Sequence, residues 1–154
     1  MKKLLLIVIL ACISSVTFAQ RHSKNAKFGQ WMDDMRQVKV EYVAKELNLN
    51  PQQKEKFAPI YDAMNKEIGK LTHETRSLEK SVRAKGSAAT DLEYDKATEA
   101  MVELKGKESA IEKKYYGQLK SVLTKQQLFN LPKAERKFTR ELMKQRRACK
   151  NNKR

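Results

Sequence analysis

The residue types that act as acids, bases or metal ligands are few in this 154-residue sequence. Its two histidines are His22, in a polar and basic segment near the start, and His73, on a helical surface that reads as exposed. No cysteine or histidine group has the spacing of metal ligands, and no glycine-rich loop suits a phosphate. Acidic residues mostly precede a basic one by four positions, as Glu103 precedes Lys107, which is the spacing of surface ion pairs on a helix. We therefore expect no catalytic residue, no metal site and no cofactor, in a protein that is not an enzyme.

Positive charge is the strongest chemical signal in the sequence. Lysine and arginine number 33 against 18 acidic residues, a net charge of +15. A basic body raises encounter rates with anionic partners, and a flexible methionine tolerates many apolar ones. The competing interpretation of each lysine is a solubilising surface. The candidate partner-binding residues are Lys66, Lys70, Arg76, Lys80, Arg83, Met101, Lys105 and Lys113.

The stretch from Leu49 to Lys85 is predicted to form one continuous helix, about 50 Å long at its full length. Asn50 suits the cap position, Pro51 suits the first helical position, and Gln53 closes a capping box with Asn50. Apolar side chains recur at steps of three and four, which makes one stripe along the helix. A lone helix with such a stripe needs a partner in water. The stripe consists of Phe57, Tyr61, Met64, Ile68, Leu71, Thr75, Leu78 and Val82, with Thr75 as its polar member.

A break at residues 85–90 precedes the partner helix. Thr90 and Glu93 form another capping box there. The helix that follows has apolar residues at heptad-like spacing, and we expect it to pack against the first long helix as an antiparallel hairpin. Glu108 and Gln118 occupy two positions of this seam, which predicts a partly solvated interface. The apolar positions are Tyr94, Ala97, Met101, Leu104, Ile111, Tyr115 and Val122.

Two further helices complete a predicted all-α, four-helix domain over residues 30–147. One runs from about Gln30 to Leu47 and has a broad apolar face. The other begins after Leu123, where Thr124 and Gln127 repeat the capping pattern. No segment alternates with a period of two, so we expect no sheet.

Prolines and polar ends set the limits of these helices. We expect Pro59 to kink the long helix and give it a bent, cradle-like form, and Pro132 to kink or restart the last helix. Residues 20–29 are polar and basic, and residues 148–154 form a basic tail. We expect both segments to be disordered, with fraying from Lys144 onward.

The first 19 residues have the features of a secretory signal peptide. Two lysines precede an apolar run from Leu4 to Ile13, and small residues suit cleavage after Ala19. A retained membrane anchor and lipidation at Cys12 are the alternatives. With the two lysines removed, 31 basic residues face 18 acidic ones, so the secreted chain has a net charge of +13.

Cysteine count and chain length bear on assembly. Cys149 is the single cysteine after residue 19, so a disulfide within one mature chain is excluded. It is either a free thiol or a bridge between two subunits. A chain of this size with long thin helices has little interior in which to hide its apolar stripes. We expect a second subunit to cover them, apolar surface to stay exposed, or both.

The pattern Leu-Asn/Thr-x-x-Gln occurs twice, at Leu49, Asn50 and Gln53 and again at Leu123, Thr124 and Gln127. These copies, together with a signal peptide and a basic helical chain, resemble the LTxxQ motifs of the Spy/CpxP family of envelope proteins, closest in look to Bacteroidetes-type members. The resemblance covers roughly residues 30–145, and the first copy departs from it by having Asn50 in place of threonine. It implies a periplasmic, cradle-shaped antiparallel homodimer. Some relatives bind zinc, but zinc ligands are missing from this sequence.

Three functions follow from charge and resemblance. The leading one is an ATP-independent periplasmic chaperone, a holdase that binds unfolded or acidic polypeptides through a basic and apolar surface. The second is a stress-response regulator that docks on the periplasmic domain of an envelope-stress sensor kinase. The third is binding to an anionic surface or to nucleic acid, and here we expect no specific nucleic acid because secretion removes the chain from it and one tryptophan is available for stacking.

Overall fold

The computed structural model describes residues 29–30 and 33–151. The expected signal peptide, its cleavage site, residues 20–28 and the last three residues of the tail lie outside this part. The chain divides into two compact units, Met1–Gln37 and Val38–Arg154. In the described part of the first unit, Arg36 and Asp33 form an ion pair of 2.6 Å and the Gln30 amide donates to Asp34 at 2.9 Å. All regular structure in the described residues is helical, which confirms the all-α prediction.

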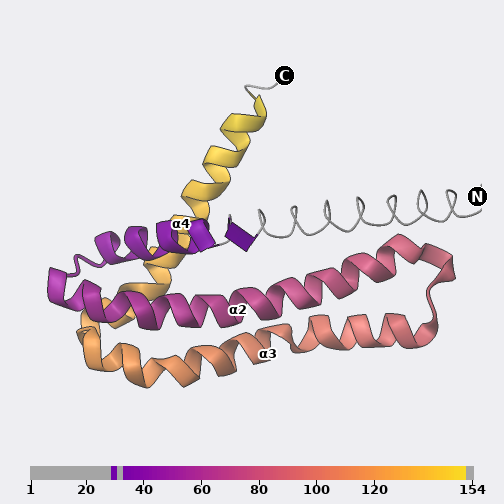
Figure 1. The fold of residues 1–154 in the computed structure, drawn as a ribbon, viewed down its shortest axis with the longest axis horizontal. Helices are drawn as coiled ribbons and strands as arrows, with labels where there is room; N and C mark the ends of the chain where they lie inside the picture. The colour runs from indigo at the N-terminus through magenta and orange to yellow at the C-terminus, as the bar shows by residue number, and fades with distance from the viewer. Residues whose placement is uncertain (1–28, 31–32, 152–154) are drawn as a thin grey trace, which may run out of the picture. The chain divides into compact units, whose positions relative to one another are not determined.

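Two long helices form the body of the second unit (Figure 1). Helix α2 spans Pro51–Lys85 and helix α3 spans Asp91–Val122, joined by the short 3-10 helix η1, Gly86–Ala88. Both predicted capping boxes are present, because the side chains of Asn50 and Thr90 accept from the backbone N–H groups of Gln53 and Glu93. Gly86 ends α2 with a φ of +51°, a backbone conformation that favours glycine. The antiparallel hairpin is confirmed.

The seam of the hairpin follows the predicted stripe of α2. Phe57, Tyr61, Met64, Thr75 and Val82 are buried. The structure places the α3 stripe differently at both ends, however. The differences lie near Leu123 at one end of α3 and near Thr90 at the other.

At the C-terminal end of α3, Leu119 lies in the seam, 3% exposed, and Gln118 is exposed. The prediction of Gln118 in the seam was wrong, because the stripe takes a step of four after Tyr115 rather than a step of three. The prediction for Glu108 is confirmed, since its side chain accepts from the Thr72 hydroxyl at 3.1 Å across the two helices. At the other end, Tyr94 and Met101 are 45% and 44% exposed, so they are surface residues rather than seam.

Helix α4 spans Lys125–Asn151 and passes through Pro132 without interruption, which excludes the restart among the two expected alternatives, a kink or a restart. α2 continues through Pro59, as the prediction of a kink rather than a helix end requires. Residues 148–151 are helical where a disordered tail was expected, and Gly29 is helical as well. The reason at the C-terminus is that lysine, arginine, glutamine and alanine are good helix formers, so they extend a helix that α4 has already nucleated.

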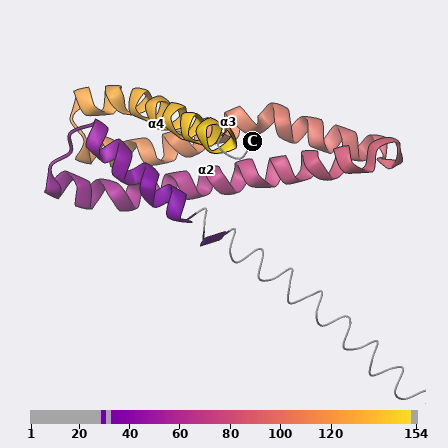
Figure 2. The ribbon, with the colours of Figure 1, turned by 90° about the horizontal axis from the view of Figure 1, so that it is seen from above.

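The hydrophobic core lies at one end of the hairpin, where α2 begins and α3 ends. There, residues 38–46, which are helical, and the first half of α4 pack on the hairpin (Figure 2). Phe57 and Tyr61 stack in this core with ring centroids 4.7 Å apart. At the far end of the hairpin, no third helix of the described residues packs on α2 and α3. We call this end the arm: residues 70–85 of α2, η1, and residues 91–106 of α3. No helix among the described residues is long and apolar enough to cross a membrane. The core residues are Val40, Val43, Ala44, Leu47, Phe57, Tyr61, Met64, Tyr115, Leu119, Leu123, Leu131 and Ala134.

Candidate functional site

The two repeated sequence motifs meet in the core end of the structure. Asn50 Oδ1 accepts from the Gln53 N–H at 2.8 Å, and the Gln53 side chain accepts from the Asn50 N–H at 3.3 Å. The second copy does the same, with Thr124 Oγ1 accepting from the Gln127 N–H at 3.1 Å and Gln127 Oε1 accepting from the Thr124 N–H at 3.0 Å. The predicted capping roles of all four residues are confirmed. Leu123 is buried in the core and Leu49 packs against it.

The glutamines of the two motifs also bind each other. Gln53 Nε2 donates to Gln127 Oε1 at 2.9 Å, and Gln127 Nε2 donates to Gln53 Oε1 at 3.2 Å. The second N–H of each amide reaches a main-chain carbonyl, that of Val122 at 3.1 Å for Gln53 and that of Leu47 at 3.3 Å for Gln127. A side-chain amide has two donor hydrogens and an oxygen with two lone pairs, so each glutamine is fully satisfied.

We call Asn50, Gln53, Thr124 and Gln127 the joint. It connects the starts of α2 and α4 to each other, to the end of α3 through Val122, and to Leu47, which directly follows the helical residues 38–46. The amide and carbonyl groups of the joint have a structural role, since none of them is a nucleophile or a base at neutral pH. The sequence predicts the caps but not the amide pair. The available signal was the repeat itself, with a glutamine at the same motif position in copies 74 residues apart.

A second contact between α2 and α4 repeats the same separation. The Tyr61 hydroxyl donates to Glu135 at 2.7 Å, also 74 residues away, and Lys39 Nζ lies 3.6 Å from the same carboxylate. Burial raises the pKa of Tyr61 well above its ordinary range, and the neighbouring Glu135 charge raises it further. Tyr61 is therefore a neutral donor at all physiological pH values. These groups fix α4 on α2 by hydrogen bonding and ion pairing.

One face of the hairpin is covered at the core end and bare along the arm. At the core end, Lys39 Nζ donates to Asn65 Oδ1 at 2.5 Å. Arg76 lies about three turns further along the same side of α2. Met101 lies about five turns from Leu119 on the same side of α3. Yet Leu119 is 3% exposed and Met101 is 44% exposed, because the covering helices stop short of the arm.

This bare surface combines apolar and cationic side chains, and we call it the arm face. It consists of Arg76 and Arg83 on α2 and of Tyr94, Met101 and Lys105 on α3. The opposite side of the hairpin is closed in part by the ion pair of Lys114 with Glu67 at 2.7 Å. Hydrogen bonds from Lys114 and then from Tyr115 lower the pKa of Glu67.

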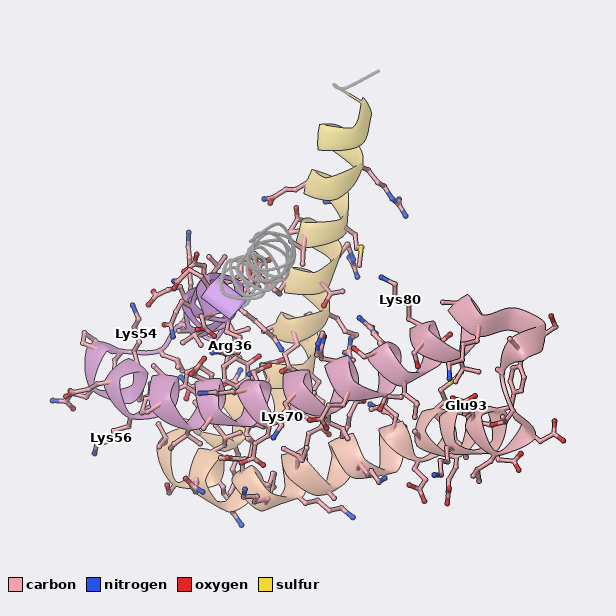
Figure 3. All side chains as sticks on the ribbon, turned by 45° about the vertical axis from the view of Figure 1, so that its right-hand side comes forward. Arg36, Lys54, Lys56, Lys70, Lys80 and Glu93 are labelled. Atoms are coloured by element: carbon pink, nitrogen blue, oxygen red, sulfur yellow. The ribbon has the colours of Figure 1, made fainter. Side chains whose placement is uncertain are left out.

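The structure does not bring all eight candidate partner-binding residues together. Arg76, Arg83, Met101 and Lys105 lie on the arm face, and Tyr94 joins them. The other four, Lys66, Lys70, Lys80 and Lys113, lie on the outer sides of their helices, turned away from the seam by helical periodicity. In Figure 3 the side chain of Lys80 extends away from α2.

Ion pairing further divides the candidate cations. Arg83 pairs with Glu79 at 2.8 Å, Lys105 with Glu108 at 3.6 Å, and Lys70 reaches Glu74 at 4.0 Å. Four of the candidate cations belong to no ion pair of the described residues: Arg76, Lys66, Lys80 and Lys113. Exposed pairs are worth about 0–1 kcal/mol, so an incoming carboxylate displaces them at little cost.

Within the described residues, no group of three or more histidine, cysteine, aspartate or glutamate side chains is placed to hold a metal ion. No family model, curated protein or solved structure matches this chain. The described residues form an all-helical hairpin with an amide-paired joint at one end and a basic, partly apolar arm at the other.

Proposed function

We propose that this protein is an ATP-independent holdase of the periplasm, related in kind to the Spy/CpxP proteins that its two glutamine motifs resemble. Its clients are unfolding polypeptides with acidic segments. The observation that carries the proposal is the arm face, where Tyr94 and Met101 are nearly half exposed between arginine and lysine side chains. Exposed apolar side chains with polar or charged side chains around them are typical of surfaces that bind other molecules.

The charges account for capture of a client. The net charge of +15, or +13 after removal of the signal peptide, attracts acidic chains over a distance set by salt, about 8 Å at physiological ionic strength. Arg76 has no carboxylate partner among the described ion pairs, so its guanidinium can bind a client carboxylate without first breaking such a pair. Arg83 and Lys105 exchange weak surface pairs for a client carboxylate.

The apolar side chains account for loose retention. The Met101 side chain is unbranched and polarisable, so it adapts to differently shaped client residues. The Tyr94 hydroxyl donates to the Gly86 carbonyl at 2.9 Å, which holds its ring in place at the end of the arm. A small apolar contact beside screened charges gives moderate affinity, and release then needs no ATP.

The test is light scattering from a protein that aggregates on unfolding, such as reduced α-lactalbumin, with purified mature protein added at low salt. We expect suppression at near-stoichiometric amounts and weaker suppression as salt increases. Absence of suppression at low salt would refute the proposal.

A charge-matched pair of variants separates the arm face from net charge. The triple variant Arg76→Gln, Arg83→Gln and Lys105→Gln removes three positive charges from the arm face. The control Lys56→Gln, Lys66→Gln and Lys96→Gln removes three exposed charges from elsewhere on the same two helices. We expect the first variant to lose most suppression and the control to keep it, whereas equal losses would assign the activity to net charge alone.

A further inference from the structure

A second partly apolar surface lies at the opposite end of the hairpin from the arm, where α3 turns into α4. An open hollow of about 510 Å³ is found there, and we call it the Phe129 hollow. Its volume is within the range of sites that hold small ligands or one or two side chains, about 300–1,000 Å³. The lining residues are Tyr116, Lys120, Leu123, Lys125, Leu128 and Phe129.

The aromatic residues of this hollow are unusually exposed. Phe129 is 84% exposed and Tyr116 is 52% exposed, while Leu123 at the base is 6% exposed. Phe129 is on α4 and Tyr116 is on α3, so the two rings come from different helices. An apolar side chain that entered between them would contact both helices and the leucine below.

The charged residues of the hollow are both cations. Lys120 is in the last turn of α3 and Lys125 begins α4. Neither lysine belongs to an ion pair of the described residues, and the first turn of α4 has no acidic side chain. A lysine at a helix N-terminus also faces the positive end of the helix dipole, which a carboxylate placed nearby would offset.

We propose that the Phe129 hollow is a docking site for a short acidic peptide segment with one large apolar side chain, phenylalanine or leucine, as its anchor. The anchor enters between Tyr116 and Phe129, and flanking carboxylates of the segment pair with Lys120 and Lys125. This inference is independent of the holdase proposal, because it concerns other residues and a defined ligand rather than unfolded chains in general.

The shape of the surface favours a peptide over a lipid membrane. A membrane-binding helix presents its apolar residues as a continuous strip beside cations. Here the apolar atoms surround a concave space between two helices, with buried Leu123 at its base. A concave apolar space rimmed by charges is typical of a site that receives one anchoring side chain.

The probe is a fluorescein-labelled peptide with a single phenylalanine flanked by aspartate and glutamate, followed by anisotropy against the full mature protein at low salt. We expect saturable binding that Phe129→Ala weakens by about tenfold, as for an anchoring contact. Tyr116→Ala should weaken it similarly, and the double variant Lys120→Gln with Lys125→Gln should weaken it by about fivefold and reduce its salt dependence. Because Phe129 and Tyr116 are exposed, these variants should keep the circular dichroism spectrum of the parent protein.

Val102→Ala is the matched control, since Val102 is 76% exposed on α3 and does not line the hollow. It should leave peptide binding unchanged, and a peptide with alanine in place of phenylalanine should bind at least tenfold more weakly. Equal binding by the parent and Phe129→Ala proteins would overturn the proposal. So would failure of the peptide to bind while vesicles of phosphatidylcholine and phosphatidylglycerol bind in a Phe129-dependent way, which would assign the surface to membranes.

Discussion

Replacing Gln127 with alanine tests whether the joint holds the helices together. The substitution removes the amide pair with Gln53, the bond to the Leu47 carbonyl and the bond from the Thr124 N–H. A net hydrogen bond contributes about 0.5–1.5 kcal/mol, and a lost helix cap costs about 1 kcal/mol. These contributions overlap, and alanine offsets part of the loss through its better helix propensity. We therefore expect the free energy of unfolding to fall by about 3 kcal/mol, a large part of the 5–15 kcal/mol of a typical domain.

The assay is urea unfolding of the mature protein followed by circular dichroism. The matched control is Gln126→Ala, which changes the neighbouring exposed glutamine and should alter stability by less than about 0.5 kcal/mol. A cycle with Gln53→Ala then isolates the amide pair. We expect the double variant to be more stable than the sum of the single losses predicts, by about 1–2 kcal/mol, since either single change already breaks the pair.

Two results would refute this account of the joint. One is a Gln127→Ala protein as stable as the Gln126→Ala control. The other is additivity of the Gln53 and Gln127 changes within about 0.3 kcal/mol, which is the behaviour of sites without contact.

Three further outcomes are expected from the core and the seam. Leu119→Ala should cost about 3 kcal/mol because it empties a buried position, whereas Gln118→Ala should cost less than about 0.5 kcal/mol; equal costs in urea unfolding would contradict the observed register. Tyr61→Phe removes the bond to Glu135 and should lower stability by about 1–2 kcal/mol, and an unchanged urea midpoint would exclude a contribution from that bond. The lowered pKa of Glu67 means that its ion pair stabilises the fold above the ordinary glutamate pKa of about 4.3 and loses this effect as the pH falls through the lower folded-state value. Glu67→Gln should therefore show a weaker fall in stability between about pH 5 and pH 3 than the parent protein, and identical acid limbs would disprove the linkage.

The sequence by itself determined the helices and the starts of α2, α3 and α4. Asn50, Thr90 and Thr124 cap helices where the pattern of side chains predicts, because capping involves backbone groups only two or three residues away. The stripe of α2 is likewise local, since helical geometry alone places residues three and four apart on one side. The predicted burial of Gln118 was wrong because steps of three and of four after Tyr115 are equally good helical spacings. Only packing against the partner helix decides that Leu119, and not Gln118, is buried.

Tertiary structure decided which side chains are covered and which groups from distant parts of the chain meet. Met101 and Leu119 lie on the same side of α3, and their different exposure depends on where residues 38–46 and α4 pack. The pairing of Gln53 with Gln127 and the hollow beside Phe129 likewise require the start of α4 to lie beside elements that are distant in sequence. Periodicity and capping act over one or two turns, so they specify each helix without specifying its neighbours. The arrangement of the helices comes from burial of their combined apolar surfaces, which is a property of the whole fold.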